Sequence, residues 1–411
     1  KYLLTTTEKG TIRLPGALAY LDLVMIGSSN EKQLDTFKTD PNFTSFKGRI
    51  ELVTVPYLLE YEKEVEIYRD QIESIRGRVH IAPHAARAGA LWAVLTRLWR
   101  PDPAHYEEPL KSLVARLAPL AKALLYQGRD PSDLEELSTE EVKILRDGLA
   151  RIAGEYRDGI VFEGRFGASP REMKSILLDA SYRKETQCFT PIQVLAQLRN
   201  LVKDKTVYDF LKLEPKGAYN DAARFVEDVD RSVVRLVLRE MKDAMALVDE
   251  TEYDRRFERY FHHVIAYIRG TKVVDPVSGR DESPDPKILS GVEQLLPTGK
   301  DIDLFRQNLI GKVGAHSMSR PGEKLNFREL FPDILRALKE DFYDKRSETI
   351  RQVEADLVLV DSPAFAGLPA ERKQRVETMI EHLRARFGYC RACALEMSGY
   401  ALRRTKGAVR A

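Results

Sequence analysis

Apolar residues recur at the spacing of an α-helix over most of this chain, from Pro83 toward its end. This spacing puts every third or fourth residue on one face, and such a face is buried against other helices in a folded protein. The first stripe consists of Leu91, Val94, Leu95 and Leu98. Similar stripes follow in later segments, so the sequence predicts a mainly α-helical fold for most of the chain.

Further helices are marked by their starts or by their buried faces. Ser138 and Glu141 have the spacing of a capping box, in which two side chains bond to the backbone at a helix start. Thr190 precedes Pro191 as an N-cap and first helical residue. An aromatic stripe at residues 253–268 also has helical spacing. We interpret that stripe as part of a hydrophobic core.

Residues 1–75 follow a different pattern. A short apolar run at residues 21–26 ends in the polar stretch Gly27-Ser28-Ser29-Asn30, and a second run at residues 50–55 stops at Pro56. Runs of this length are typical of strands that are buried in a parallel sheet. Two strands and a helix are too few to close a sheet. We therefore expect the partner strands to precede Lys1 in a longer protein.

Length, charge and cysteine content limit the classes of protein to which the chain can belong. Its 411 residues are enough for two or three domains of roughly 150 residues each. A formal net charge of +2 argues against a surface that wraps a polyanion, so we do not expect nucleic acid as a partner. No apolar run approaches the roughly 18 residues of a membrane span. With only three cysteines, we expect a soluble protein of the reducing cytoplasm.

Two of these cysteines, Cys390 and Cys393, have the Cys-x-x-Cys spacing of metal and redox sites. They lie in a helical pattern, and a second pair of ligands is missing unless Cys188 and a histidine come close. The sequence therefore favours buried helical cysteines and predicts no metal site. A metal site remains the alternative if Cys188 and a histidine lie close to this pair.

The strongest helix start lies at residues 169–172. Ser169 can be the N-cap, Pro170 the first helical residue and Glu172 the partner of a Ser-x-x-Glu capping box. This arrangement puts Arg171 at the second helical position, where the helix dipole favours an anion by about 0.3 to 1 kcal/mol. A cation at this position is more easily explained if an anion lies opposite it. The alternative is a solvated arginine that follows a good cap.

The order of these features resembles the second half of an AAA+ nucleotide-hydrolysing module. By this resemblance, Asn30 corresponds to the first sensor, which orients the attacking water, and Arg49 to the arginine finger that is offered to a neighbouring subunit. Arg171 corresponds to the second sensor, on the helical lid. The residue types suit phosphoryl transfer, which depends on positioning and on positive charge around the phosphates. Taken singly, Asn30 could cap a turn and Arg49 could be a surface cation.

More specifically, the chain resembles the PrkA family, bacterial proteins described as serine protein kinases. The resemblance is carried by residues 27–31, 49–57, 80–84, 94–98, 167–177, 260–279, 305–310 and 331–335. It implies the second half of an AAA+ α/β core at 1–75, a helical lid with an insertion at 76–185, and a PrkA-type helical carboxy-terminal domain at 186–411. It also implies ATP and Mg²⁺ as cofactors, a protein substrate, and a homo-oligomer assembled through the AAA+ core.

One part of the family pattern is missing from the sequence. The 411 residues contain neither a Gly-x-x-x-x-Gly-Lys-Ser/Thr phosphate loop nor a strand ending in the paired acidic residues that bind magnesium. The family's order puts both upstream of Lys1. Eukaryotic-type kinase signatures are also missing, so the resemblance alone implies kinase activity. The functions left open are an ATP-dependent serine protein kinase, an AAA+ ATPase that remodels or degrades a protein client, and a non-catalytic helical regulatory module.

The missing phosphate loop leads to a first prediction. The chain on its own should be inactive and should not bind ATP tightly, because most contacts to the phosphates would come from that loop. Calorimetric titration with ATP and Mg²⁺ should show no saturable binding below the millimolar range, which corresponds to about −4 kcal/mol. A micromolar dissociation constant would contradict this expectation.

Overall fold

The computed structural model describes residues 9–22, 24–41, 43–131, 137–156, 162–182, 187–245, 250–274, 281–296, 301–319, 330–345, 347–360 and 362–408. The chain divides into two compact units, Lys1–Pro56 and Tyr57–Ala411. It is mainly α-helical, as the sequence predicts. The further division at 75 and 185 stays a prediction. Among the described residues, no helix combines the length and the apolar character needed to cross a membrane.

The first unit contains a β-hairpin and two short helices. Strand β1 (Thr11–Leu14) pairs with β2 (Ala17–Tyr20) in antiparallel register. Helices α2 (Glu31–Lys38) and α3 (Phe43–Lys47) follow, and they are joined by an edge-to-face contact between Phe37 and Phe43, whose ring centres are 5.4 Å apart.

The two strands expected in this unit are absent from the residues that the structure describes. The described residues at 21–26 and 50–55 are not paired with another strand, and Val24, Ile26 and Val55 are 90%, 92% and 85% exposed. A strand needs a neighbouring strand to bond its N–H and C=O groups. The hairpin is the only sheet in the described part of the unit, so these apolar runs have no strand to pair with.

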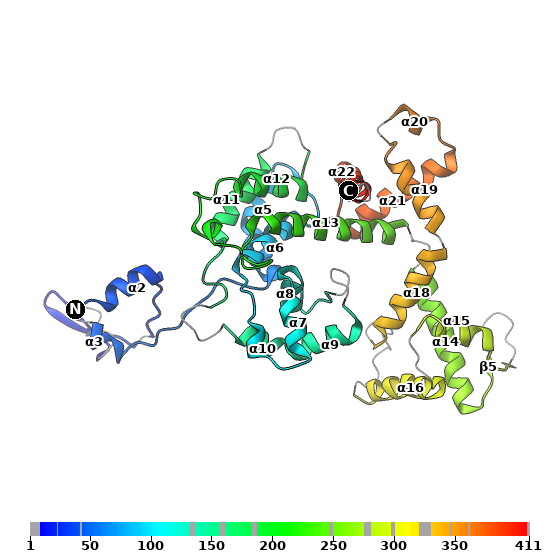
Figure 1. Cartoon of the computed structure of the whole chain (residues 1–411), viewed down its shortest axis with the longest axis horizontal. Coiled ribbons are helices and arrows are strands. Elements are labelled where there is room, and N and C mark those ends of the chain that lie inside the picture. Colours follow the sequence, from blue (N-terminus) through cyan, green and yellow to red (C-terminus); the bar gives the residue numbers. More distant parts are fainter. Residues whose placement is uncertain are drawn as a thin grey trace. The chain divides into compact units, whose positions relative to one another are not determined.

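The second unit is built around helix α6 (Ala85–Arg97), in which almost every residue is buried. It packs against helices that surround it in the main core: α4 (Tyr61–Ile67), α8 (Pro119–Tyr126), α11 (Pro170–Ser181), α12 (Pro191–Leu201) and α13 (Ala222–Met245). Helix α5 (Arg69–Arg76) packs against α11. The long helix α13 connects this group to α19 (Ser347–Leu357), α21 (Ala370–Phe387) and α22 (Arg391–Ala408), beside which it lies in Figure 1.

Two smaller cores complete the unit. One is formed by α7 (Leu110–Arg116), α9 (Thr139–Asp147) and α10 (Leu149–Gly154). The other joins α14 (Glu250–Arg269), α15 (Pro286–Glu293), α16 (Ile302–Ser319) and α18 (Pro332–Lys345). Phe257, Tyr260 and Phe261 are buried in this last core, so the interpretation of the aromatic stripe is confirmed for these residues.

A two-residue parallel bridge connects distant parts of the main core. Strand β3 (His80–Ile81) pairs with β4 (Cys188–Phe189), and His80 lies directly opposite Cys188. The backbone N–H of Ala82 donates to the carbonyl of Phe189 at 2.9 Å, which fixes the register. The start of α6 and the start of α12 are thereby held next to each other.

Candidate functional site

The helix start predicted around Arg171 is present. The Ser169 hydroxyl accepts a hydrogen bond from the Glu172 backbone N–H at 3.2 Å, and the Glu172 carboxylate accepts one from the Ser169 N–H at 2.6 Å. Pro170 is the first residue of α11, and Arg171 follows it. The Arg171 side chain is exposed, and its guanidinium makes no ion pair or hydrogen bond within the described parts of the chain. The side chain is therefore accessible to a ligand.

Arg97 holds the residue in front of this helix start. Its guanidinium is fully buried and donates to both carboxylate oxygens of Glu64, at 2.7 and 2.9 Å, and to the Ala168 carbonyl at 2.9 Å. The Thr96 hydroxyl accepts from the Ala168 N–H at 2.9 Å. Both backbone groups of Ala168 are thus bound by α6, so the position of the α11 start relative to α6 is fixed.

Gly167 allows this close contact. Its φ of +123° favours glycine, and an added Cβ would lie 2.7 Å from Arg97 Cγ and 2.8 Å from the Thr96 carbonyl oxygen. A side chain at this position would push the helix start away from α6. The glycine that precedes Ala168 is therefore a packing requirement.

A second buried ion pair holds the other end of the same segment. Lys122 is fully buried, and its Nζ donates to Glu163 at 2.5 Å and to the Trp99 carbonyl at 2.9 Å. Tyr126 donates to the other oxygen of Glu163 at 2.6 Å. Burial lowers the pKa of Lys122, whereas the adjacent Glu163 carboxylate opposes this shift. The segment before α11 is thus tied to the core through charged groups at both of its ends.

The two other predicted site residues lie in the first unit. Asn30 is the N-cap of α2, where its Oδ1 accepts from the Gln33 N–H at 2.8 Å. Arg49 is exposed and donates to the carbonyl of Ser45 in α3. Asn30 therefore performs the capping role that the sequence left open as an alternative. Because Arg171 belongs to the second unit, the convergence of the three residues on one nucleotide stays a prediction.

The condition set for a metal site at the cysteines is met. Cys390 and Cys393 lie beside Cys188 and His80, and the four ligand atoms are all within 4.8 Å of one another. Burial raises the pKa of Cys188 to about 12 and raises the pKa of Cys393 as well. Buried cysteines and a metal site therefore both stay open as interpretations of this cluster.

No pattern in the sequence predicted a role for Arg97, Glu64, Lys122 or Glu163. The sequence does contain one signal for Arg97, which ends a helix whose remaining positions are nearly all apolar. A charged side chain that is buried in such a helix must be paired. Its partner could not be named, since Glu64 lies on another helix. For His80, the pairing with Cys188 follows only from the β3–β4 register.

Two family models match the chain. The model described as the PrkA serine protein kinase C-terminal domain matches residues 120–400, and the model described as the PrkA AAA domain matches residues 1–105. No solved structure matches.

Curated relatives match over part of their length. The "ATP-dependent protease PrkA" of Bacillus subtilis (strain 168) is 24% identical over 329 residues, which are 79% of this chain and 47% of that protein. The "Serine/threonine kinase YeaG" of Escherichia coli (strain K12) is 28% identical over 179 residues, which are 43% of this chain and 24% of that protein. The chain thus spans about half the length of the first relative and about a quarter of the second.

Proposed function

This chain belongs to the PrkA family, and on that premise we propose that it is part of an ATP-dependent protein kinase of the PrkA type in which Arg171 senses the nucleotide. The observation that carries the proposal is the position of Arg171. It is an exposed cation at the positive end of α11, and its helix start is fixed by a capping box and by Arg97. The Arg171 guanidinium can donate to phosphate oxygens, and the positive end of the helix dipole adds to the attraction for a phosphate group.

The roles of the three site residues follow from their chemistry. Arg171 binds a phosphate oxygen from the lid and stabilises the nucleotide-bound state. Arg49, offered to a neighbouring subunit, stabilises the negative charge that develops on the transferred phosphoryl group. Asn30 uses its side-chain oxygen in the α2 cap, so its amide N–H₂ is the group that would orient the attacking water or hydroxyl. By the order of motifs in the family, the phosphate loop and the Mg²⁺ ligands would precede Lys1, and no residue of this chain is assigned to them.

A second candidate reaction shares the same nucleotide chemistry. The Bacillus relative, which aligns with 79% of this chain, is named an ATP-dependent protease. In that case ATP hydrolysis would drive the remodelling or degradation of a protein client instead of its phosphorylation. Both candidates require Arg49 and Arg171, whereas a purely regulatory helical module requires neither.

An assay of the complete protein tests the proposal and separates the two reactions. The protein is incubated with Mg²⁺, casein as a model client, and ATP labelled at the γ-phosphate. A kinase transfers the label to serine residues, whereas a protease yields peptides in an ATP-dependent manner without transfer of label. The variant Arg49→Ala is the matched control, in which either product should be lost. Absence of ATP turnover in the wild type would contradict the proposed enzyme.

A further inference from the structure

A cluster of one histidine and three cysteines lies in the second unit, away from Arg171 in the sequence. Cys188 Sγ is 3.2 Å from Cys390 Sγ, and Cys393 Sγ is 3.6 Å from His80 Nδ1. All four ligand atoms lie within 4.8 Å of one another. Cys188 and Cys393 are buried, while Cys390 and His80 are partly exposed. These four side chains thus form a compact set of nitrogen and sulfur donors.

Three separate elements hold the donors in place. His80 and Cys188 are opposite each other in the parallel bridge between β3 and β4. The Gln193 side chain donates to the Cys188 carbonyl at 3.2 Å, and this hydrogen bond helps to fix the backbone at Cys188. Cys390 precedes α22, and Cys393 lies in its first turn. The backbone, rather than contact among the side chains alone, therefore brings the donors together.

The sulfurs of the Cys-x-x-Cys pair accept hydrogen bonds from backbone N–H groups at the start of α22. The Cys390 N–H donates to Cys393 Sγ at 3.1 Å, and the Cys393 N–H lies 3.5 Å from Cys390 Sγ. Hydrogen bonds from backbone N–H groups stabilise negative sulfur, and the positive end of the α22 dipole adds to this effect. These effects offset part of the burial that raises the pKa of Cys393, and a bound cation would stabilise both thiolates further.

We propose that His80, Cys188, Cys390 and Cys393 bind one Zn²⁺ ion at a structural site. In a tetrahedral zinc site, with Zn–S near 2.3 Å and Zn–N near 2.0 to 2.1 Å, neighbouring ligand atoms are about 3.5 to 3.8 Å apart. The Cys393–His80 separation of 3.6 Å lies in that range, and the Cys188–Cys390 separation of 3.2 Å is about half an ångström too short. The other pairs lie within 4.8 Å, so binding would draw the ligand atoms together by up to about one ångström. Four protein ligands leave no coordination position for a substrate, which is typical of structural rather than catalytic zinc.

Zinc binding releases protons from the thiols and sets the net charge of the site. Each of the three thiols releases one proton when it coordinates the metal, and His80 binds through its neutral ring. Three thiolates and Zn²⁺ leave a net charge of −1 at the site. Sulfur and imidazole donors select zinc over magnesium or calcium, which prefer oxygen ligands.

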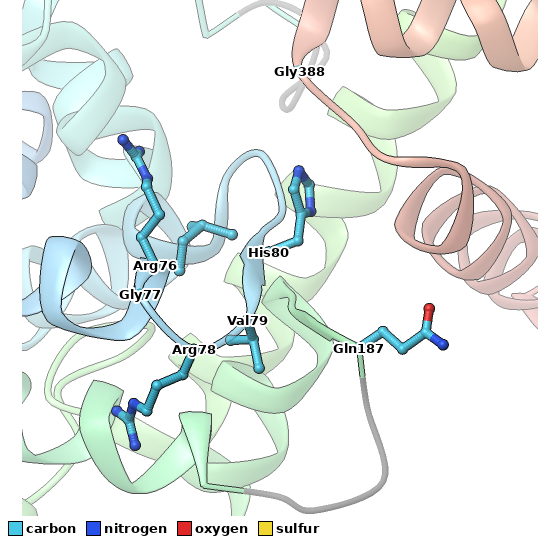
Figure 2. A pocket seen from close by; sticks show the side chains of 8 residues that line it. Arg76, Gly77, Arg78, Val79, His80, Gln187 and Gly388 are labelled. Carbon is cyan, nitrogen blue, oxygen red and sulfur yellow. The ribbon is translucent and has the colours of Figure 1, made fainter.

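The ion would join parts of the chain that are far apart in the sequence. Cys188 and Cys390 are separated by 202 positions, and His80 and Cys393 by 313. A bound metal would thus fix α22 to the starts of α6 and α12. A pocket of about 590 Å³ lies next to the cluster, since His80 borders it from β3 and Gly388 borders it from the end of α21 (Figure 2).

Metal analysis of the complete protein, purified without added metal or chelator, tests the proposal. The wild type should contain about one zinc per chain, and Cys390→Ser and His80→Ala should each lose most of it. The matched control is His262→Ala, which removes an exposed histidine from α14. Zinc content that is unchanged in Cys390→Ser and His80→Ala would overturn the proposal, as would iron in place of zinc.

A second measurement on the wild type covers the case in which the variants do not fold. Zinc is removed with a chelator under reducing conditions, and Co²⁺ is added in its place. Tetrahedral thiolate coordination should give intense absorption from sulfur-to-cobalt charge transfer, and the melting temperature should rise by about 5 °C or more over the metal-free protein. A Cys188–Cys390 disulfide in the isolated protein, or a cobalt spectrum without thiolate bands, would overturn the proposal.

Discussion

Replacing Arg49 with alanine should lower ATP turnover by the complete protein about a thousandfold or more, while ATP binding is largely retained. The reason is that an arginine finger acts on charge that develops in the transition state and contributes little to the ground state. Steady-state ATP hydrolysis and nucleotide titration measure the two effects separately. The matched control is Lys47→Ala, which removes another exposed cation at the end of α3 and should keep nearly full activity.

Mixing experiments identify the subunit on which Arg49 acts. An Arg49→Ala protein combined with a variant in the phosphate loop of the complete protein should regain part of the activity if the finger crosses a subunit interface. Wild-type turnover in the Arg49→Ala protein would contradict the assignment. An inactive variant that no mixing ratio rescues would mean that Arg49 does not act across subunits.

Replacing Arg97 with leucine should destabilise the second unit by about 3 to 5 kcal/mol, because the fully buried Glu64 carboxylate loses its ion-pair partner and keeps only the hydrogen bond from the Tyr68 hydroxyl. The midpoint of denaturant-induced unfolding, followed by a probe in this unit, measures the loss. The control is Arg384→Ala, which removes an exposed cation paired with Glu381 and should cost less than about 1 kcal/mol.

The double variant Arg97→Leu, Glu64→Leu separates the pair's charge from its packing. Removing both charges should restore part of the stability, since no unpaired carboxylate remains in the core. A single Arg97→Leu variant that is as stable as the Arg384→Ala control would show that the buried pair does not hold the α11 start. A double variant less stable than Arg97→Leu would show that Glu64 stabilises the fold without Arg97.

Local signals in the sequence predicted the helical part of the fold well. The capping boxes at Ser138 and Ser169 are present as predicted, because each depends only on residues within one turn of a helix. The apolar stripe through Val94 and Leu95 is buried for a similar reason, since helical spacing alone decides which residues share a face. The family resemblance is also confirmed, by the model that matches residues 120–400.

Features that depend on distant partners could not be predicted in the same way. The apolar runs at 21–26 and 50–55 have the composition of strands, but a strand forms only where another strand can pair with it. Arg97 and Glu64 lie on different helices, and their ion pair follows from the packing of α6 against α4. To predict the cysteine cluster, one would need to know the β3–β4 register and the packing of α22 beside these strands. Neither of these features has a local signature in the sequence.

The nucleotide-induced gain in thermal stability of the Arg171→Ala variant tests the central claim most directly. Without nucleotide, this variant of the complete protein should melt like the wild type, because Ser169, Pro170 and Glu172 still define the helix start. With ATP and Mg²⁺, its gain in stability should be smaller than that of the wild type by about 1.5 to 3 kcal/mol, the contribution of a charged hydrogen bond to phosphate. Lys174→Ala, one turn further along α11, should retain the full gain. A variant that melts early without ligand and gains as much from ATP as the wild type would show that Arg171 is structural and does not sense the nucleotide.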